Sequence, residues 1–415
     1  MSSAPLNVIR ISRRLWVGIA LVLLAPWAIV VWLLPRAPAP PSRPPAKQSP
    51  AAAARPETKY EVKSGAWGEL DFQRILLEPP EEFIRPDAGN PSPVVWVFHQ
   101  ATSDGLAALW IRAGLSETER RALQDVTTHP ADDTFLVQPP ASIVLGLSAT
   151  ARGTIYGVLA ESPENRPQRE PFRFRADAVD EWFENSHVSS GVIALTKRLL
   201  YQQHNAVFFA DVDVVFPQIP MMEERLALLK TLARRTALIV RLRVPHNADV
   251  EALARYWRHG RRSKDARPLL ASLAQQPDGG EIDIAHLLPK FARSLLNTYP
   301  DPGVSVSHDC HWTSFNFFED EIDERYSQID FVKQTLLSDY YQVTGEPMLG
   351  DILLFVQGDG VVVHSCVHIA DGIVFTKNGA SFFVPWTLSR HDNVVAAYSL
   401  SPTPLEIRRY RLKQP

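Results

Sequence analysis

The segment Gly350-Asp-Ile-Leu-Leu-Phe-Val356 is followed by a Gly358-Asp-Gly360 turn and then by Val361-Val-Val-His-Ser-Cys-Val-His-Ile-Ala370. The dipeptide Asp371-Gly372 separates this second run from Ile373-Val-Phe-Thr-Lys-Asn378. Runs of β-branched and aromatic residues between glycine turns are typical of strands, and Asp-Gly favours a two-residue hairpin. The pattern predicts an antiparallel meander of three strands.

Just before this meander lies Ser307-His-Asp-Cys-His-Trp-Thr-Ser-Phe-Asn-Phe-Phe318. Its aromatic residues fall partly on one face of a helix, which predicts that a helix begins at Cys310. The N-terminus of a helix carries a partial positive charge and free N–H groups, and both favour a thiolate. We therefore expect a lowered pKa for the Cys310 thiol, and a nucleophile of this kind also needs a proton carrier.

These residues resemble the NlpC-type cell-wall cysteine hydrolases, a family with a papain-like fold. The family pattern is an Asp-Cys at a helix start, a Gly-Asp strand, a strand with histidine, and a glycine hairpin before a third strand. Asp309-Cys310, Gly350-Asp351, His364 and Asp371-Gly372 occur here in that order. The resemblance implies that Cys310 is the nucleophile and His364 the base. It covers residues 297–409.

Two further site residues follow from the same resemblance. Counting from the histidine places the family's orienting residue at Thr376, whereas Asn378 points to the same strand face and suits that role better. A tyrosine that assists the site in relatives corresponds to Tyr299. The chain departs from the family pattern after the cysteine, where bulky His311-Trp312 replace the usual Ser-Gly, and it lacks the Gly-Gly after the tyrosine.

The resemblance implies a hydrolase that cleaves an amide bond in peptidoglycan peptides without a cofactor. An alternative is a catalytically inactive envelope protein that binds cell-wall glycan or a protein partner. Cys366 is expected to pack as a small residue, although a disulfide with Cys310 would disable the enzyme. A third possibility is a zinc site. Its ligands would be His308, Cys310, His311, His364 and His368.

The N-terminal region predicts a membrane anchor. Leu15–Leu34 are twenty consecutive uncharged residues, enough for a helix of roughly 30 Å, which matches the hydrocarbon core of a bilayer. Pro35–Glu57 contain eight prolines and predict an extended linker. We expect a single-pass protein of the bacterial inner membrane with a retained anchor and its body on the periplasmic side. Cleavage as a signal peptide is the alternative.

The predicted fold class is α+β. Its parts are a cytoplasmic flank (1–14), a transmembrane helix (15–34), a Pro/Ala-rich linker (35–64), a mixed α/β domain of unknown role (65–296) and a papain-like domain with a helix packed on an antiparallel sheet (297–415). The formal net charge of −3 argues against a nucleic-acid-coating protein.

In the middle region, short β-rich runs alternate with helical patterns. One helix is expected to start with a capping box at Ser116–Glu119, and another to cover Ser190–Gln203. Asp211 and Asp213 could in principle bind a metal. A basic cluster around Gly260 is a solvated helix end or a contact for an anionic polymer.

Overall fold

The computed structural model describes residues 60–61, 64–89, 93–131, 133–175, 179–203, 206–258, 265–301, 303, 308–399 and 405–413. In this part of the chain, none of the helices is both long enough and apolar enough to cross a membrane. Among these residues the structure does not show the transmembrane component of the predicted fold class, and what it shows is a mixed α/β protein with antiparallel sheets. The predicted span Leu15–Leu34 itself lies outside the described residues.

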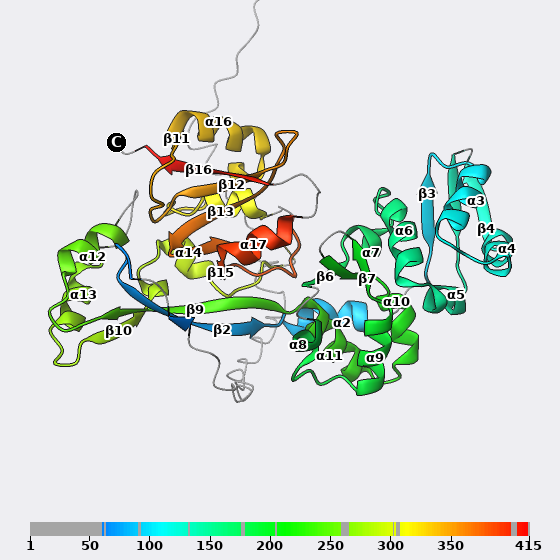
Figure 1. The fold of residues 1–415 in the computed structure, drawn as a ribbon, viewed down its shortest axis with the longest axis horizontal. Helices are drawn as coiled ribbons and strands as arrows, with labels where there is room; N and C mark the ends of the chain where they lie inside the picture. The colour runs from blue at the N-terminus through cyan, green and yellow to red at the C-terminus, as the bar shows by residue number, and fades with distance from the viewer. Residues whose placement is uncertain are drawn as a thin grey trace, which may run out of the picture. The chain divides into compact units, whose positions relative to one another are not determined.

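Two long antiparallel strands, β2 and β9, form the centre of the first sheet. They pair along their whole length, from Glu69 opposite Arg243 to Leu77 opposite Arg235 (Figure 1). The sheet has the strand order β1-β2-β9-β10. Its members are β1 (Tyr60–Glu61), β2 (Glu69–Leu77), β9 (Arg235–Val244) and β10 (Gly280–Asp283). Because β2 and β9 are partners, residues 78–234 form one large insertion between them.

The insertion contains two small antiparallel sheets, of order β3-β5-β4 and β6-β8-β7, with helices around them. The strands are β3 (Trp96–His99), β4 (Thr127–Ala131), β5 (Thr134–Val137), β6 (Phe172–Arg175), β7 (Tyr201–Gln203) and β8 (Ala206–Phe209). The helices are α2 (Glu81–Gly89), α3 (Ser103–Arg112), α4 (Glu117–Asp125), α5 (Ala141–Gly146), α6 (Ala149–Leu159), α7 (Arg166–Arg169), α8 (Val179–Phe183), α9 (Ser190–Arg198), α10 (Val212–Val215), the 3₁₀ turn η2 (Phe216–Gln218) and α11 (Met222–Ala233).

The capping box predicted for the insertion is confirmed. The Ser116 side chain accepts from the Glu119 N–H, and the Glu119 carboxylate accepts from the Ser116 N–H, which satisfies two free donors at the start of α4. The predicted helix at Ser190–Gln203 is too long. It ends at Arg198, and Tyr201–Gln203 instead form strand β7, because they pair with β8.

The C-terminal region is built on an antiparallel sheet of strand order β11-β16-β12-β13-β14-β15. Its strands are β11 (Tyr340–Gln342), β12 (Ile352–Val356), β13 (Val362–Ala370), β14 (Ile373–Thr376), β15 (Thr387–Arg390) and β16 (Glu406–Leu412). The helices between β9 and this sheet, and those beside its strands, are α12 (Val250–Trp257), α13 (Arg267–Ala274), η3 (Ile284–His286), α14 (Lys290–Leu295), α15 (Cys310–Phe315), η4 (Glu324–Ser327), α16 (Ile329–Asp339) and α17 (His391–Tyr398).

The predicted meander of β12, β13 and β14 is confirmed. Asp371 and Gly372 both have positive φ, of 41° and 66°, as a tight hairpin of the I′ type requires. Successive side chains of β13 point to opposite faces of the sheet. Ser365 bonds Ser314 of α15, whereas Cys366 shares a core cluster with Val394 of α17. The two helices therefore lie against opposite faces of the sheet.

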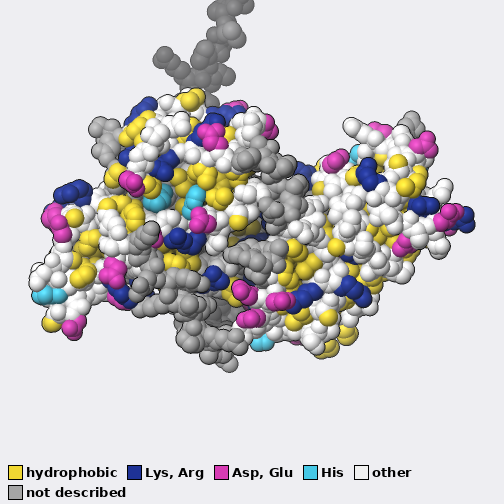
Figure 2. Space-filling model, viewed as in Figure 1, with side chains coloured by type: hydrophobic (Ala, Val, Ile, Leu, Met, Phe, Trp, Pro, Cys, Tyr) yellow, Lys and Arg dark blue, Asp and Glu magenta, His cyan; other side chains and the backbone are white. Residues whose placement is uncertain are grey.

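One hydrophobic core joins the first sheet to the C-terminal sheet across the boundary expected at residue 297. It contains Val240 and Leu242 of β9 together with Val367 and Ile369 of β13. The Tyr256 hydroxyl of α12 also donates to the Ile369 carbonyl at 2.7 Å. On the face shown in Figure 2, acidic and basic side chains lie interspersed, in keeping with the small net charge.

Candidate active site

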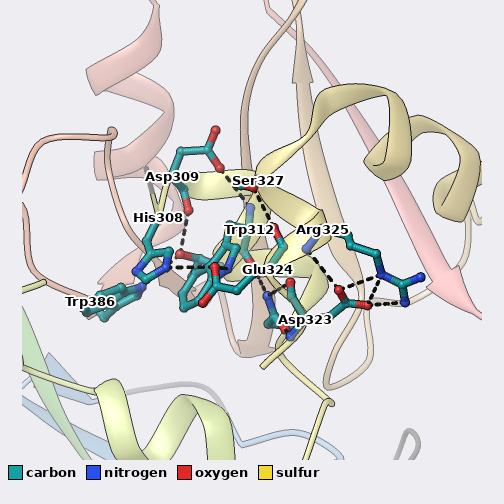
Figure 3. A network of polar contacts seen from close by, with 10 residues as sticks. His308, Asp309, Trp312, Asp323, Glu324, Arg325, Ser327 and Trp386 are labelled. Carbon is teal, nitrogen blue, oxygen red and sulfur yellow. Dashed lines mark hydrogen bonds and ion pairs between the residues drawn. The ribbon is translucent and has the colours of Figure 1, made fainter. Parts of the chain in front are cut away.

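Helix α15 is fixed at its first turn by its own sequence. Asp309 is the N-cap residue, and its carboxylate accepts the Trp312 N–H at 2.9 Å, which satisfies one free donor of the helix (Figure 3). The Thr313 hydroxyl donates to the Asp309 carbonyl at 2.7 Å. Cys310 therefore occupies the first helical position, as the sequence predicts.

The two bulky residues after Cys310 have defined partners. The Trp312 indole N–H donates to Glu324 Oε2 at 3.1 Å, and its ring stacks on the His308 imidazole with centroids 3.8 Å apart. His308 Nε2 lies 3.1 Å from the same carboxylate oxygen (Figure 3). His311 Nδ1 lies 2.9 Å from Ser365 Oγ on β13. The His311 contact ties the start of α15 to the sheet, and the contacts of Trp312 and His308 tie it to Glu324 of η4.

Three backbone N–H groups act on the Cys310 thiol. The backbone N–H of Ser365 interacts with the thiol, and so do those of Cys310 and His311. The N–H of Ser365 is available because the pairing between β13 and β14 covers only Val367 to Ala370. Ser365 Oγ also donates to the Cys310 carbonyl oxygen at 3.1 Å, which ties the backbone of Cys310 to β13.

The expected thiolate is not the resting form. Burial raises the pKa of the Cys310 thiol to about 11, and the Asp309 carboxylate adds to this, while the three N–H groups lower the pKa only in part. The side chain is 7% exposed. The predicted lowering of this pKa by the helix N-terminus is therefore wrong, because desolvation of the charged form outweighs the helix electrostatics.

His364 is held in one tautomer by a chain of hydrogen bonds. Its Nε2 lies 3.1 Å from Thr376 Oγ1, and the Thr376 hydroxyl donates to Asn378 Oδ1 at 3.0 Å. Because the single hydroxyl proton is given to Asn378, Thr376 accepts from His364, so Nε2 carries the imidazole proton. The other nitrogen, Nδ1, then presents a lone pair. It is buried and has no hydrogen-bond partner.

The sequence offered Thr376 and Asn378 as alternatives, and the structure uses them in series. Thr376 contacts the imidazole, and Asn378 contacts Thr376. The imidazole ring also stacks on Tyr398 of α17, with centroids 4.1 Å apart and an interplanar angle of 15°. Burial lowers the pKa of His364 to about 3, helped by nearby His311, so the imidazole is neutral near pH 7.

Lys377 is a site residue that the sequence reasoning missed. Its side chain is fully buried, and its ammonium donates to the Gly379 and Ser381 carbonyls at 2.7 and 3.0 Å. Burial lowers its pKa to about 8, while the charges of Cys310 and Asp309 oppose that shift. The signal in the sequence was a lysine at the end of an apolar third strand, where a charged residue is costly unless it has a role.

Tyr299 is not shown beside the predicted nucleophile. Its hydroxyl is buried without a hydrogen-bond partner. Burial raises its pKa, and the charged groups that act on it are Arg235, at the start of β9, and Glu78. The family role implied for Tyr299 stays a prediction.

The remaining candidates have structural partners. Cys310 and Cys366 are both free thiols, so they do not form a disulfide. Cys366 packs in an apolar cluster with Leu353 and Phe355, as expected. The proposed zinc ligands are not gathered at one point among the described residues.

Asp211 in the insertion is also accounted for. Its carboxylate forms an ion pair with Arg152 at 2.7 Å and accepts from the Tyr156 hydroxyl, and all three side chains are buried. This is a structural ion pair rather than a metal ligand. The basic cluster around Gly260 falls largely on residues 259–264, outside the described residues.

No protein-family model, curated protein or solved structure matches this chain. The catalytic interpretation therefore depends on the arrangement of Cys310, His364, Thr376 and Asn378.

Proposed function

We propose that this chain is a cysteine hydrolase that cleaves an amide bond, with peptidoglycan peptides as the substrate class. The observation that carries the proposal is the orientation of His364. Its Nε2–H is committed to the Thr376–Asn378 chain, which leaves the lone pair of Nδ1 without a partner, and the backbone N–H of the next residue, Ser365, acts on the Cys310 thiol. An imidazole in a fixed tautomer can take up a thiol proton, and catalysis by this pair requires the Cys310 thiol to approach Nδ1, which has no hydrogen-bond partner in the structure.

In this mechanism the thiol and the imidazole are both neutral at rest. The Cys310 sulfur attacks the amide carbonyl carbon while its proton moves to His364 Nδ1, so no isolated thiolate has to form in the buried site. The C–S bond forms, and the carbonyl oxygen becomes an oxyanion. The N–H groups of Cys310 and His311 at the start of α15, together with the Lys377 charge, stabilise this negative charge.

The tetrahedral adduct then collapses. The C–N bond breaks, and His364 Nδ1–H gives its proton to the leaving amine. A water molecule attacks the resulting thioester, again losing a proton to Nδ1, and the thiol is restored as the acid product leaves. Throughout these steps the Thr376–Asn378 chain supports the imidazolium by accepting from Nε2–H.

The proposal is tested by alkylation of the native full chain with iodoacetamide, followed by peptide mass spectrometry. The Cys310 peptide is expected to be alkylated in the folded protein, while the fully buried Cys366 is not. In the His364→Ala variant, iodoacetamide should alkylate Cys310 at least tenfold more slowly than in the wild type, because general-base assistance is lost. Cys366→Ala is the matched control and should keep the wild-type rate. A native chain that is alkylated at Cys310 only after unfolding would refute the proposal.

Burial favours one second candidate. Cys310 is 7% exposed and His364 is 0% exposed, which restricts substrate access to both groups, whereas a chain that binds cell-wall material without cleaving it needs no such access. Binding of the full chain to purified cell-wall sacculi, undiminished by Cys310→Ala and without release of soluble fragments, would support that function. Loss of wall fragments only with the wild type would exclude it.

A further inference from the structure

The Ser365 hydroxyl on β13 has three polar contacts but only one proton. It donates to the Cys310 carbonyl oxygen at 3.1 Å and to Ser314 Oγ at 3.0 Å, and it lies 2.9 Å from His311 Nδ1. Ser365 and Ser314 are both buried, so bulk water does not compete for these contacts. We call these four residues the Ser365 node.

The number of protons in the node fixes the tautomer of His311. A hydroxyl offers one donor and two lone pairs, and the Ser365 proton is directed at the Cys310 carbonyl and at Ser314. The contact with His311 therefore needs a proton from the imidazole, so Nδ1–H donates to Ser365 Oγ. Burial lowers the pKa of His311, although Asp309 opposes this shift, so the imidazole is neutral near pH 7 and Nε2 carries no proton.

His311 and His364 then carry their protons on opposite nitrogens. His364 donates from Nε2 to Thr376 Oγ1, whereas His311 donates from Nδ1 to Ser365 Oγ. In both cases the hydroxyl of a sheet residue selects the tautomer. This difference between two histidines of one site can be measured, and it follows from the hydrogen bonds alone.

The node holds α15 on the sheet. Its other three members, Cys310, His311 and Ser314, all belong to this helix of six residues. A helix this short has little stability of its own, so contacts with the rest of the fold decide where its first turn lies. Ser365 makes one of these contacts with the backbone of the proposed nucleophile itself.

We propose that Ser365 is a positioning residue for the proposed reaction, and that His311 is the donor that orients its hydroxyl. Ser365 acts through the Cys310 carbonyl and holds the peptide group of the nucleophile against β13, the strand that carries His364. The inference deepens the proposed hydrolase function and rests on it. It also gives a role to bulky His311, at which the chain departs from the Ser-Gly of the family pattern.

The first test is the tautomer of His311 in the native full chain near pH 7. Two-bond ¹H–¹⁵N correlation spectra distinguish a protonated imidazole nitrogen from a bare one, and His311→Asn removes the signal and so assigns it. We expect the proton of His311 on Nδ1 and that of His364 on Nε2. A proton on Nε2 of His311 would overturn the inference, whether or not the chain is a hydrolase.

The second test separates positioning from folding through the initial rates of muropeptide cleavage. Ser365→Ala should lower kcat by about tenfold and leave KM within about twofold, the effect of losing about one hydrogen bond that aligns the nucleophile. His311→Leu removes the Nδ1–H donor and should also lower kcat, whereas His311→Asn offers an amide N–H in its place and should restore most of kcat. Thr196→Val is the control. It removes an equally buried hydroxyl that donates to a carbonyl of the insertion, and should leave kcat unchanged.

An unchanged kcat in folded Ser365→Ala and His311→Leu would overturn the inference and leave the hydrolase intact. If the wild type cleaves no muropeptide, the proposed function fails, and the node is judged by the tautomer and by a double-mutant cycle in urea unfolding. Ser365→Ala and His311→Leu should then cost less together than the sum of their separate effects, because either one already breaks the contact. Additive costs would overturn the node as well.

Discussion

Replacing Thr376 by valine tests the hydrogen-bond chain behind His364. Valine has nearly the same shape but no hydroxyl, so the buried Nε2–H of His364 loses the acceptor that lies 3.1 Å away. An unsatisfied buried donor costs about 1–3 kcal/mol, which should appear as lower stability in urea unfolding. The imidazole proton is then no longer held on Nε2, and the tautomer with a proton on Nδ1 cannot accept the thiol proton.

The expected kinetic effect follows from the same energy. A loss of about 1.4–2.8 kcal/mol in the preference for the active tautomer slows the alkylation of Cys310 by about 10- to 100-fold. The assay is the second-order rate with iodoacetamide near neutral pH. Thr376→Ser retains the hydroxyl and should stay within about threefold of the wild type. A Thr376→Val protein that is folded and reacts as fast as the wild type would refute the role given to this chain.

Three further outcomes are expected. Gly350→Ala would place a Cβ 2.1 Å from the Phe318 ring at a φ of +88°, so it should lower the free energy of unfolding by about 2 kcal/mol or more. The control Gly345→Ala adds a Cβ that meets nothing within 4 Å and should change this free energy little. Equal effects of the two substitutions in urea unfolding would contradict the prediction. Lys377→Met removes the nearby positive charge and should move the alkylation profile of Cys310 to higher pH, and an unmoved profile would exclude the electrostatic role. Burial lowers the pKa of His368 to about 4, so this side chain binds a proton in the unfolded state before it does in the folded state, and the free energy of unfolding should fall as the pH drops from about 6.5 to 4. His368→Gln should flatten this dependence of stability on pH. A urea-unfolding pH profile that the substitution leaves unchanged would show that another group causes the dependence.

The meander was predictable because its information is local. Apolar runs set β12 and β13, and the Asp371-Gly372 dipeptide has the positive φ values that the hairpin demands. Asp309 likewise caps α15 through a contact only three residues away. The Gly-Asp pair proved structural, since Asp351 is fully buried and both of its oxygens accept from Arg411 at 2.8 Å.

The electrostatics of the site were not predictable from the sequence. The raised pKa of Cys310 depends on the sheet that buries it, and a local helix argument gave the opposite sign. Lys377 was passed over for the same reason, since its burial is a tertiary effect.

The most direct test of the central claim is digestion of purified muropeptides by the full chain, followed by mass spectrometry. The wild type is expected to release fragments that differ from the intact muropeptide by the addition of one water across an amide bond, and Cys310→Ala should release none. Cys366→Ala should retain the activity. Intact muropeptides after prolonged incubation with folded wild-type protein, or equal cleavage by Cys310→Ala, would contradict the assignment of Cys310 as the nucleophile of a peptidoglycan hydrolase.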